Sequence, residues 1–350
     1  MSKRYDVTIA IPVYHAVPYI RKSLCSALSQ TWPGIEFLLF DDGDDTGSMD
    51  IVRELQATHP RGGDIHLTGS PVNLGVGAAR NRLIDEAQGD YIYFMDSDDI
   101  IEPNCIELLL NHQRASQADV VFGSYDKIEL FDADRRTTRK QYAHSVFTDP
   151  DALPRYAFSR YGALQFSACN FIVRRSLLKE CGLRFAEANY WEDMGFTLLL
   201  TTHVGRAVLL PDITYHYLCH LNSLSNYQQR DTISKSEITG NALTVSQLEA
   251  NCRRLREKSY YPEVCLLLAK TYFYIACNAV ENSAIVRPPF TAAELKALLH
   301  HPATLDETLR FDHLRLQNIA LWLLARLPAI CTRLLLRTYC QFKNKRNNAS

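Results

Sequence analysis

The stretch YFMDSDDI, residues 93–100, places three carboxylates directly after an apolar run. Side chains alternate along a strand, so Asp96 and Asp98, an Asp-x-Asp pair, share one face if the strand geometry persists. Such close carboxylates repel one another, and Mg²⁺ or Mn²⁺ is the partner that most readily holds them ionised. Magnesium usually takes some of its ligands from substrate phosphates, so a nucleotide diphosphate would complete the site. An Asp-rich turn before a helix near Pro103 explains the same residues equally well.

Outward from this stretch, strand patterns alternate with helix patterns. Strands are predicted at 6–13, 35–42, 64–69, 90–95 and 118–125, and helices at 19–29, 49–58, 76–87 and 103–116. This alternation predicts right-handed crossovers and an α/β fold, a Rossmann-like sandwich around a mostly parallel sheet. The carboxyl ends of such strands gather polar loops, and a ligand is expected at that edge.

The chain changes character beyond about residue 226. The segments after Asp231 carry helical periodicity with few strand or turn signals, so we expect one domain over 1–228 and a helical region over 229–350. Residues 131–150 are polar and patternless, which predicts a long loop or an irregular edge hairpin.

Composition narrows the class of protein. Of the 350 residues 47% are hydrophobic and 22% charged, with a net charge of −1, so the chain is globular and nucleic acid is not an expected partner. Ten cysteines without a CxxC pair argue against a zinc site or a disulfide framework. The start, MSKRYDVTIAIPVY, runs into a strand without an export region, which predicts a cytoplasmic protein.

Two further groups of polar residues stand near predicted strand ends. Asp41 and Asp42 end the second strand, where a carboxylate can accept hydrogen bonds from a base or a ribose, or simply lie in a solvated turn. The loop NLGVGAARN, residues 73–81, lacks the third glycine of the dinucleotide fingerprint and does not follow the first strand. It brings Arg80, which could contact a phosphate or a base.

Four motifs together resemble glycosyltransferase family 2 on the GT-A fold. They are TIAIPVYHAVPYIRKSLCSALSQTWPGIEFLLFDDGDDTGS, NLGVGAARN, GDYIYFMDSDD and WEDMGF, and the resemblance covers roughly residues 5–225. It implies that a sugar passes from a nucleotide-diphosphate donor, above all a UDP-sugar, to a hydroxyl of a glycan or lipid-linked acceptor in polysaccharide biosynthesis. Inversion at the anomeric carbon and Mn²⁺ or Mg²⁺ as cofactor are implied as well. The nucleotide-binding half would span about 1–100 and the acceptor half about 101–228. Asp44 departs from the family's usual Asp-Asp-Gly-Ser run and puts a loop detail in doubt.

The resemblance also implies roles for single residues. The nucleotide would contact Pro12, Val13, Tyr14, Asp41, Asp42, Arg80 and Asp96. Asp99 and Trp191 would lie near the donor sugar, and Asp98 and His216 would ligate the metal. Asp193, in the first turn of a helix whose dipole favours its ionised form, would be the general base, with Glu192 shaping the acceptor site. Ser223 and Ser225 could donate hydrogen bonds to the diphosphate.

Other readings of these residues stay open. Glu192 and Asp193 are also typical helix N-terminal acids, Trp191 could be plain core, and His216 could be a satisfied core histidine. A nucleotidyltransferase would want a basic, glycine-rich loop after the first strand, and IPVYHAVPYI lacks it. A non-catalytic nucleotide-sugar or Ca²⁺-binding module is loosely suggested by DDGDDTG, without the spaced final glutamate.

The end of the chain contains basic residues and no acid. The segment from Leu316 to Asn348 carries six arginines and lysines within an apolar run that Pro328 interrupts. It is a poor membrane span, and it predicts either an interfacial helix at the inner face of an anionic membrane or a helix packed on the protein's own core.

Overall fold

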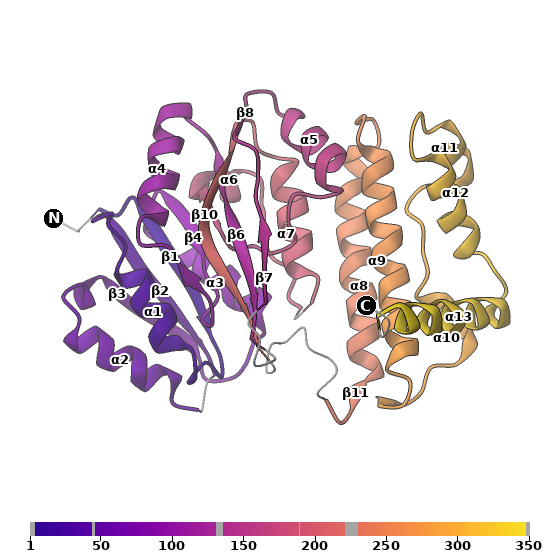
Figure 1. The fold of residues 1–350 in the computed structure, drawn as a ribbon, viewed down its shortest axis with the longest axis horizontal. Helices are drawn as coiled ribbons and strands as arrows, with labels where there is room; N and C mark the ends of the chain where they lie inside the picture. The colour runs from indigo at the N-terminus through magenta and orange to yellow at the C-terminus, as the bar shows by residue number, and fades with distance from the viewer. Residues whose placement is uncertain (1–3, 44–45, 131–135, 189, 221–229, 348–350) are drawn as a thin grey trace. The chain divides into compact units, whose positions relative to one another are not determined.

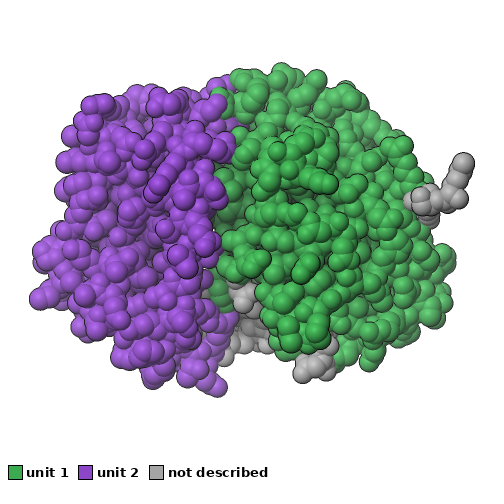
Figure 2. Space-filling model, turned by 180° about the vertical axis from the view of Figure 1, so that it is seen from behind, with its two compact units in different colours: residues 1–153, 165–226 green, residues 154–164, 227–350 purple. Residues whose placement is uncertain are grey.

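The computed structural model describes residues 4–43, 46–130, 136–188, 190–220 and 230–347. Asp44, Ser223 and Ser225 therefore lie outside the described residues. The chain forms two compact units, coloured separately in Figure 2. Unit 1 comprises 1–153 and 165–226, and unit 2 comprises 154–164 and 227–350. Residues 154–164 thus group with the C-terminal helices, although they lie within the first 228 residues.

Unit 1 is built on one twisted sheet with the strand order β3-β2-β1-β4-β9-β6-β10-β5 (Figure 1). Its strands are β1 (Val7–Val13), β2 (Ile35–Asp42), β3 (Ile65–Ser70), β4 (Tyr91–Phe94), β5 (Ile100–Ile101), β6 (Val120–Glu129), β7 (Arg136–Lys140), β8 (Ser145–Phe147), β9 (Phe171–Arg174) and β10 (Ala207–Cys219). Strand β1 pairs in parallel with β2 and β4, and β2 with β3. Strand β9 runs antiparallel between β4 and β6, and β10 pairs in parallel with β6.

Helices cover both faces of this sheet. They are α1 (Ile20–Leu28), α2 (Ser48–Thr58), α3 (Val76–Glu86), α4 (Cys105–Ser116), α6 (Arg175–Glu180) and α7 (Glu192–Thr201). Because side chains alternate along a strand, Ile9 and Ile11 of β1 point to the face that packs with α1, α2 and α4. On the other face, Phe94 packs edge-on against Phe185 and Phe196, near α3 and α7.

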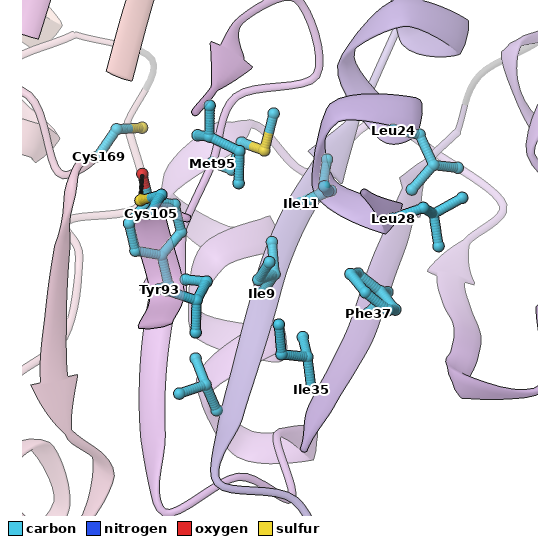
Figure 3. Close-up of a cluster of buried hydrophobic side chains, with 14 of the residues drawn as sticks. Ile9, Ile11, Leu24, Leu28, Ile35, Phe37, Tyr93, Met95, Cys105 and Cys169 are labelled. Carbon is cyan, nitrogen blue, oxygen red and sulfur yellow. Dashed lines mark hydrogen bonds between the residues drawn. The ribbon is translucent and has the colours of Figure 1, made fainter. Parts of the chain in front are cut away.

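Figure 3 shows part of the core on the first face, where β1, β2 and β4 meet α1 and α4. Ile9, Phe37 and Tyr93 are fully buried there, and the Cys105 thiol is 3.5 Å from the Tyr93 hydroxyl. Burying such apolar side chains is the main force that holds the helices on the sheet. The loops at the strands' carboxyl ends are therefore mounted on a close-packed, rigid base.

Unit 2 is helical. It contains most of α5 (Ala152–Tyr161), then α8 (Lys235–Cys252), α9 (Tyr261–Glu281), α10 (Ala292–Ala297), α11 (Leu305–Arg310), α12 (Arg315–Leu324) and α13 (Ala329–Asn347), with a small pair of strands, β11 (Ile233–Ser234) and β12 (Val286–Arg287). Helices α8, α12 and α13 pack against α9. Within the described residues α9 is the one helix long and apolar enough to cross a membrane, and 61% of its apolar window is buried, as in a core helix.

The fold predicted from the sequence is confirmed: an α/β sandwich followed by C-terminal helices. The parallel character resides in β3, β2, β1 and β4, and β9 makes the second half of the sheet mixed. The patternless stretch 131–150 contains β7, which pairs with β6 as an antiparallel edge. That arrangement matches the hairpin alternative for the part of this stretch that the structure describes.

Candidate active site

The carboxyl ends of β1, β2 and β4 meet at one edge of the sheet, and the predicted polar residues follow them. Asp42 is the last residue of β2 and is buried. Its two carboxylate oxygens accept hydrogen bonds from the backbone N–H groups of Leu74 and Gly75, at 2.7 and 3.0 Å. Burial raises the pKa of Asp42, and these two bonds oppose the shift. Asp42 therefore anchors the glycine loop, and its contact with a base stays a prediction.

The backbone requires glycine at both glycine positions of the loop 73–81. Gly75 precedes α3 with a φ of 88°, a region that glycine adopts readily. A Cβ on Gly77 would lie 2.0 Å from the carbonyl oxygen of Ala186, so only glycine lets α3 approach that segment. This close approach sets α3 beside the chain leading into α7. Arg80, one turn further along α3, can then reach the acids of α7.

Arg80 is the centre of the site. Its Nη1 donates to Asp193 Oδ1 at 2.6 Å and to Glu192 Oε1 at 3.1 Å, and its Nη2 donates to Asp96 Oδ1 at 2.8 Å. The side chain is only 3% exposed, and its guanidinium carbon lies 5.4 Å from the centroid of the Phe185 ring. One buried cation thus joins the loop after β4 to the start of α7.

The cluster has more acids than bases. One guanidinium faces three carboxylates, so full ionisation would leave two negative charges without a partner in a place that is only partly open to water. Burial raises the pKa of Asp193 to about 7, with the charges of Glu192 and Asp96 adding to the shift and Arg80 opposing it. Burial likewise raises the pKa of Glu192. A carboxyl that titrates near neutrality can both take and release a proton.

Strained backbone stands directly before these acids. Trp191 has a φ of 67°, in the left-handed region that bulky residues rarely adopt. Its carbonyl accepts the N–H of Gly195, which closes the first turn of α7. The helix therefore begins at Glu192, and both acids lie in its first turn, where the helix dipole favours negative charge. The side chain of Trp191 is half-buried beside them.

The remaining two carboxylates of 93–100 have different surroundings. Asp99 is buried, accepting from the Tyr215 hydroxyl at 2.5 Å and from the Leu218 backbone N–H at 2.7 Å. Burial raises its pKa well above the usual range, with the neighbouring charges of Asp98 and Asp96 adding to the shift. Asp98 keeps 28% of its side chain exposed, and its Oδ2 lies 2.7 Å from His220 Nε2. Asp99 thus ties the loop to β10, while Asp98 faces outward.

His220, rather than His216, is the histidine that the structure brings to Asp98. Its ring stacks on Tyr19 at a centroid distance of 4.0 Å, just before α1. His216 lies within β10, and its Nε2 is 2.6 Å from Glu102 Oε1. Among the described residues no three acidic, histidine or cysteine side chains converge as a complete metal site. The partly exposed Asp98 carboxylate is a ligand type that suits Mn²⁺ or Mg²⁺, whereas His220 Nε2 is engaged with Asp98 Oδ2 itself, so cation binding here stays a prediction. A metal role for His216 stays a prediction.

The end of β1 contributes backbone and one ring. Val13 is part of the core, Pro12 is half-buried, and Tyr14 is 42% exposed with its ring stacked on His15 at 3.9 Å. Asp41 is half-buried at the same edge as Asp42. The side chain of Val13 points into the protein, so any nucleotide contact there would use backbone atoms or Tyr14. The roles predicted for these residues stay predictions.

The similar proteins described here are glycosyltransferases. The model of the family described as "Glycosyl transferase family 2" matches residues 8–182. An uncharacterized glycosyltransferase of Haemophilus influenzae is 36% identical over 205 residues, 58% of this chain and 74% of the relative. A cholesterol galactosyltransferase of Borreliella burgdorferi is 23% identical over 287 residues, 79% of this chain and 78% of the relative. Two glycosyltransferases from Bacillus subtilis, one putative and one uncharacterized, are also similar to this chain, and the alignment spans only 64% and 62% of their length.

A solved structure shares the fold. The crystal structure of Staphylococcus aureus TarS 1-349 in complex with UDP-GlcNAc superposes with a TM-score of 0.59. The superposition covers 96% of this chain and 92% of that one, at 16% sequence identity. An identity this low supports the shared fold alone.

Proposed function

Because this chain belongs to glycosyl transferase family 2, we propose that it transfers a sugar from a nucleotide-diphosphate donor to a hydroxyl group with inversion at the anomeric carbon. The observation that carries this proposal is the position of Arg80. It joins Asp96, in the loop expected to hold the donor, to Asp193, the expected base, within 2.6 to 2.8 Å. The loop expected to bind the donor and the expected base are thus both held by the Arg80 guanidinium.

In the proposed reaction Asp193 acts as the general base. Ionised, it takes the proton of the acceptor hydroxyl while that oxygen forms a bond to the anomeric carbon. The bond between this carbon and the diphosphate oxygen breaks, and the nucleoside diphosphate departs from the opposite face with the bonding electrons. The partial exposure of Asp193, 24% of its side chain, leaves room for an acceptor hydroxyl.

The other residues hold the reactants. We assign Asp96 to the donor ribose and Asp98 with His220 to a divalent cation, Mn²⁺ or Mg²⁺. Such a cation would neutralise charge on the departing diphosphate. The partial exposure of Asp98 supports its assignment, and His220 would have to release its 2.7 Å hydrogen bond to Asp98 before its Nε2 could bind the cation. Trp191 and Glu192, at the start of α7, would border the sugar and the acceptor.

We further infer the class of donor and acceptor. UDP-sugars are the expected donors, and TarS, which shares the fold, was crystallised with UDP-GlcNAc. The acceptor would be a glycan or a lipid-linked hydroxyl in polysaccharide synthesis. The cholesterol galactosyltransferase of Borreliella burgdorferi, which is similar to this chain, offers a precedent for a lipid acceptor. Such an acceptor would suit a cytoplasmic enzyme at the inner face of a membrane.

The product released from the donor tests the proposal. Purified full-length protein is incubated with UDP-, GDP- and dTDP-sugars and Mn²⁺ after a screen for thermal stabilisation by each donor. Release of nucleoside diphosphate supports glycosyl transfer or donor hydrolysis. In a parallel incubation with sugar phosphate and nucleoside triphosphate, release of pyrophosphate would instead indicate a nucleotidyltransferase. Stabilisation without either product would leave a binding module. For variants of the site acids, Asp85→Asn is the matched control, because it breaks only a surface ion pair with Arg184.

A further inference from the structure

The outward faces of α12 and α13 carry large apolar side chains. In α12, Leu316 and Leu323 stand seven positions apart and are 81% and 53% exposed. In α13, Ile330, Leu334 and Phe342 follow the four-residue spacing of one helix face and are 73%, 60% and 69% exposed. We call these five residues the apolar row. Large apolar side chains that recur along the exposed face of a helix mark an interaction site rather than ordinary surface.

The opposite face of α13 already has its partner inside unit 2. Thr332, Leu336 and Cys340 recur every four residues and are buried. The Cys340 thiol lies 3.8 Å from the carbonyl oxygen of Cys277 in α9, and α13 also packs against α10. Packing on the protein's own core therefore accounts for one side of the helix. The apolar row is a second, separate face.

The charge around the apolar row favours an anionic partner. Residues 314–350 contain no aspartate or glutamate. Arg315, Arg326, Arg333 and Arg337 lie in α12, in α13 and in the turn between them, whereas Lys343 is paired with Glu281 of α9 at 2.9 Å. The guanidinium carbon of Arg326 lies 3.6 Å from the centroid of the Trp322 ring, so it covers apolar surface as well. Apolar side chains interspersed with cations are typical of helices that lie in the headgroup region of anionic bilayers.

A second copy of the chain fits this face less well. Symmetric dimers bring the same patch of both subunits together, which here would set arginine against arginine. Like charges at an interface oppose association, whereas lipid phosphates would neutralise them. A purely polar polyanion would leave the apolar row in water.

We propose that the apolar row docks this protein on an anionic phospholipid surface, with the leucines, Ile330 and Phe342 at the acyl boundary and the arginines on headgroup phosphates. The proposal concerns unit 2 alone and holds whether or not unit 1 transfers sugars. The α12 and α13 helices would lie in the plane of the surface rather than cross it.

Vesicle flotation of the full-length protein tests this docking. The vesicles contain phosphatidylcholine with or without phosphatidylglycerol. Ile330→Ser/Leu334→Ser/Phe342→Ser should lower binding to the anionic vesicles at least tenfold, because each large apolar side chain contributes about tenfold to partitioning. Arg333→Gln/Arg337→Gln should lower it roughly fivefold per arginine and flatten its dependence on salt. Leu243→Ser on α8, 60% exposed in the same unit, is the control and should bind like the wild type.

Circular dichroism of each variant checks that it is folded. Wild-type protein that fails to float with anionic vesicles would overturn the proposal, and so would a folded triple variant that still floats. The wild type could instead form a dimer in sedimentation velocity and not bind vesicles. If the triple variant were then monomeric, the face would be assigned to a second copy of the chain. Equal binding to neutral and anionic vesicles would refute the role of the arginines.

Discussion

Replacing Arg80 by methionine should destabilise unit 1 more than the loss of any surface ion pair. The change removes three charged hydrogen bonds of 2.6, 2.8 and 3.1 Å and leaves three carboxyls facing one another. Removing one partner of a buried ionic network costs about 3–5 kcal/mol. Asp96 and Asp193 keep 29% and 24% of their side chains exposed, so water can relieve part of the penalty and the lower value, about 3 kcal/mol, applies.

The assay is thermal and urea denaturation of the full-length protein at neutral pH. A loss of about 3 kcal/mol corresponds to a fall in melting temperature of about 6–12 °C for a unit of this size. Arg21→Met is the matched control, because Arg21 also makes two bonds to one acid, Glu54, but both side chains are about half exposed. That change should cost much less, because water and salt screen an exposed ion pair.

Acid provides a second test of the same reasoning. Burial raises the pKa of Asp193 and of Glu192, and below those pKa values the two carboxyls are neutral, so the missing arginine should matter less as the pH falls. An Arg80→Met variant that loses no more stability than Arg21→Met, or whose deficit grows at low pH, would refute the idea that Arg80 compensates buried carboxylates.

Three further predictions concern catalysis. Asp193→Asn should lower transfer, measured by product formation, by about 10²–10⁴-fold. The affinity for the donor, measured by calorimetry, should stay within a few-fold of the wild type. Full activity of this variant would disprove the role of Asp193 as base. Because burial raises the pKa of Asp193 to about 7 and the base must be ionised, kcat/KM should rise nearly tenfold per pH unit below 7 and level off above it; a flat profile between pH 6 and 8 would contradict this. Asp98→Ala and His220→Ala should each weaken Mn²⁺-dependent donor binding more than His216→Ala does, and a larger loss in His216→Ala would identify His216 as the ligand.

Much of the fold follows from patterns that are local in the sequence. The apolar runs ending at Val13, Asp42 and Phe94 have the length and composition of buried parallel strands, and helical spacing fills the gaps between them. Strand β9, a short apolar segment between two helices, is harder to recognise, because four residues carry little periodicity. Its antiparallel insertion beside β4 depends on tertiary packing.

The chemistry of the site was only partly predictable, because its partners are distant in the sequence. Asp96 and Asp193 stand out as acids near element ends, yet nothing local joins them to Arg80, which lies 113 residues from Asp193. Gly77 gives a retrospective signal: only glycine allows α3 close enough to the segment at Ala186 for that contact.

Which histidine lies beside Asp98 depends on where β10 ends. His216 pairs with Ile100 within β10, whereas β10 ends at Cys219 and His220 follows directly at the edge near Asp98. Strand ends are the least certain part of a sequence prediction, and β10 also contains a register irregularity before Tyr215. No local pattern separates His220 from His216, so only the structure shows which imidazole lies beside Asp98.

The most direct test of the central claim is a crystal structure of the protein soaked with UDP and Mn²⁺, with anomalous diffraction to locate the metal. We predict manganese bound to Asp98 and His220 and bridging the diphosphate, with the ribose near Asp96. A nucleotide bound elsewhere, or manganese that contacts neither residue, would contradict a transfer site organised around Arg80.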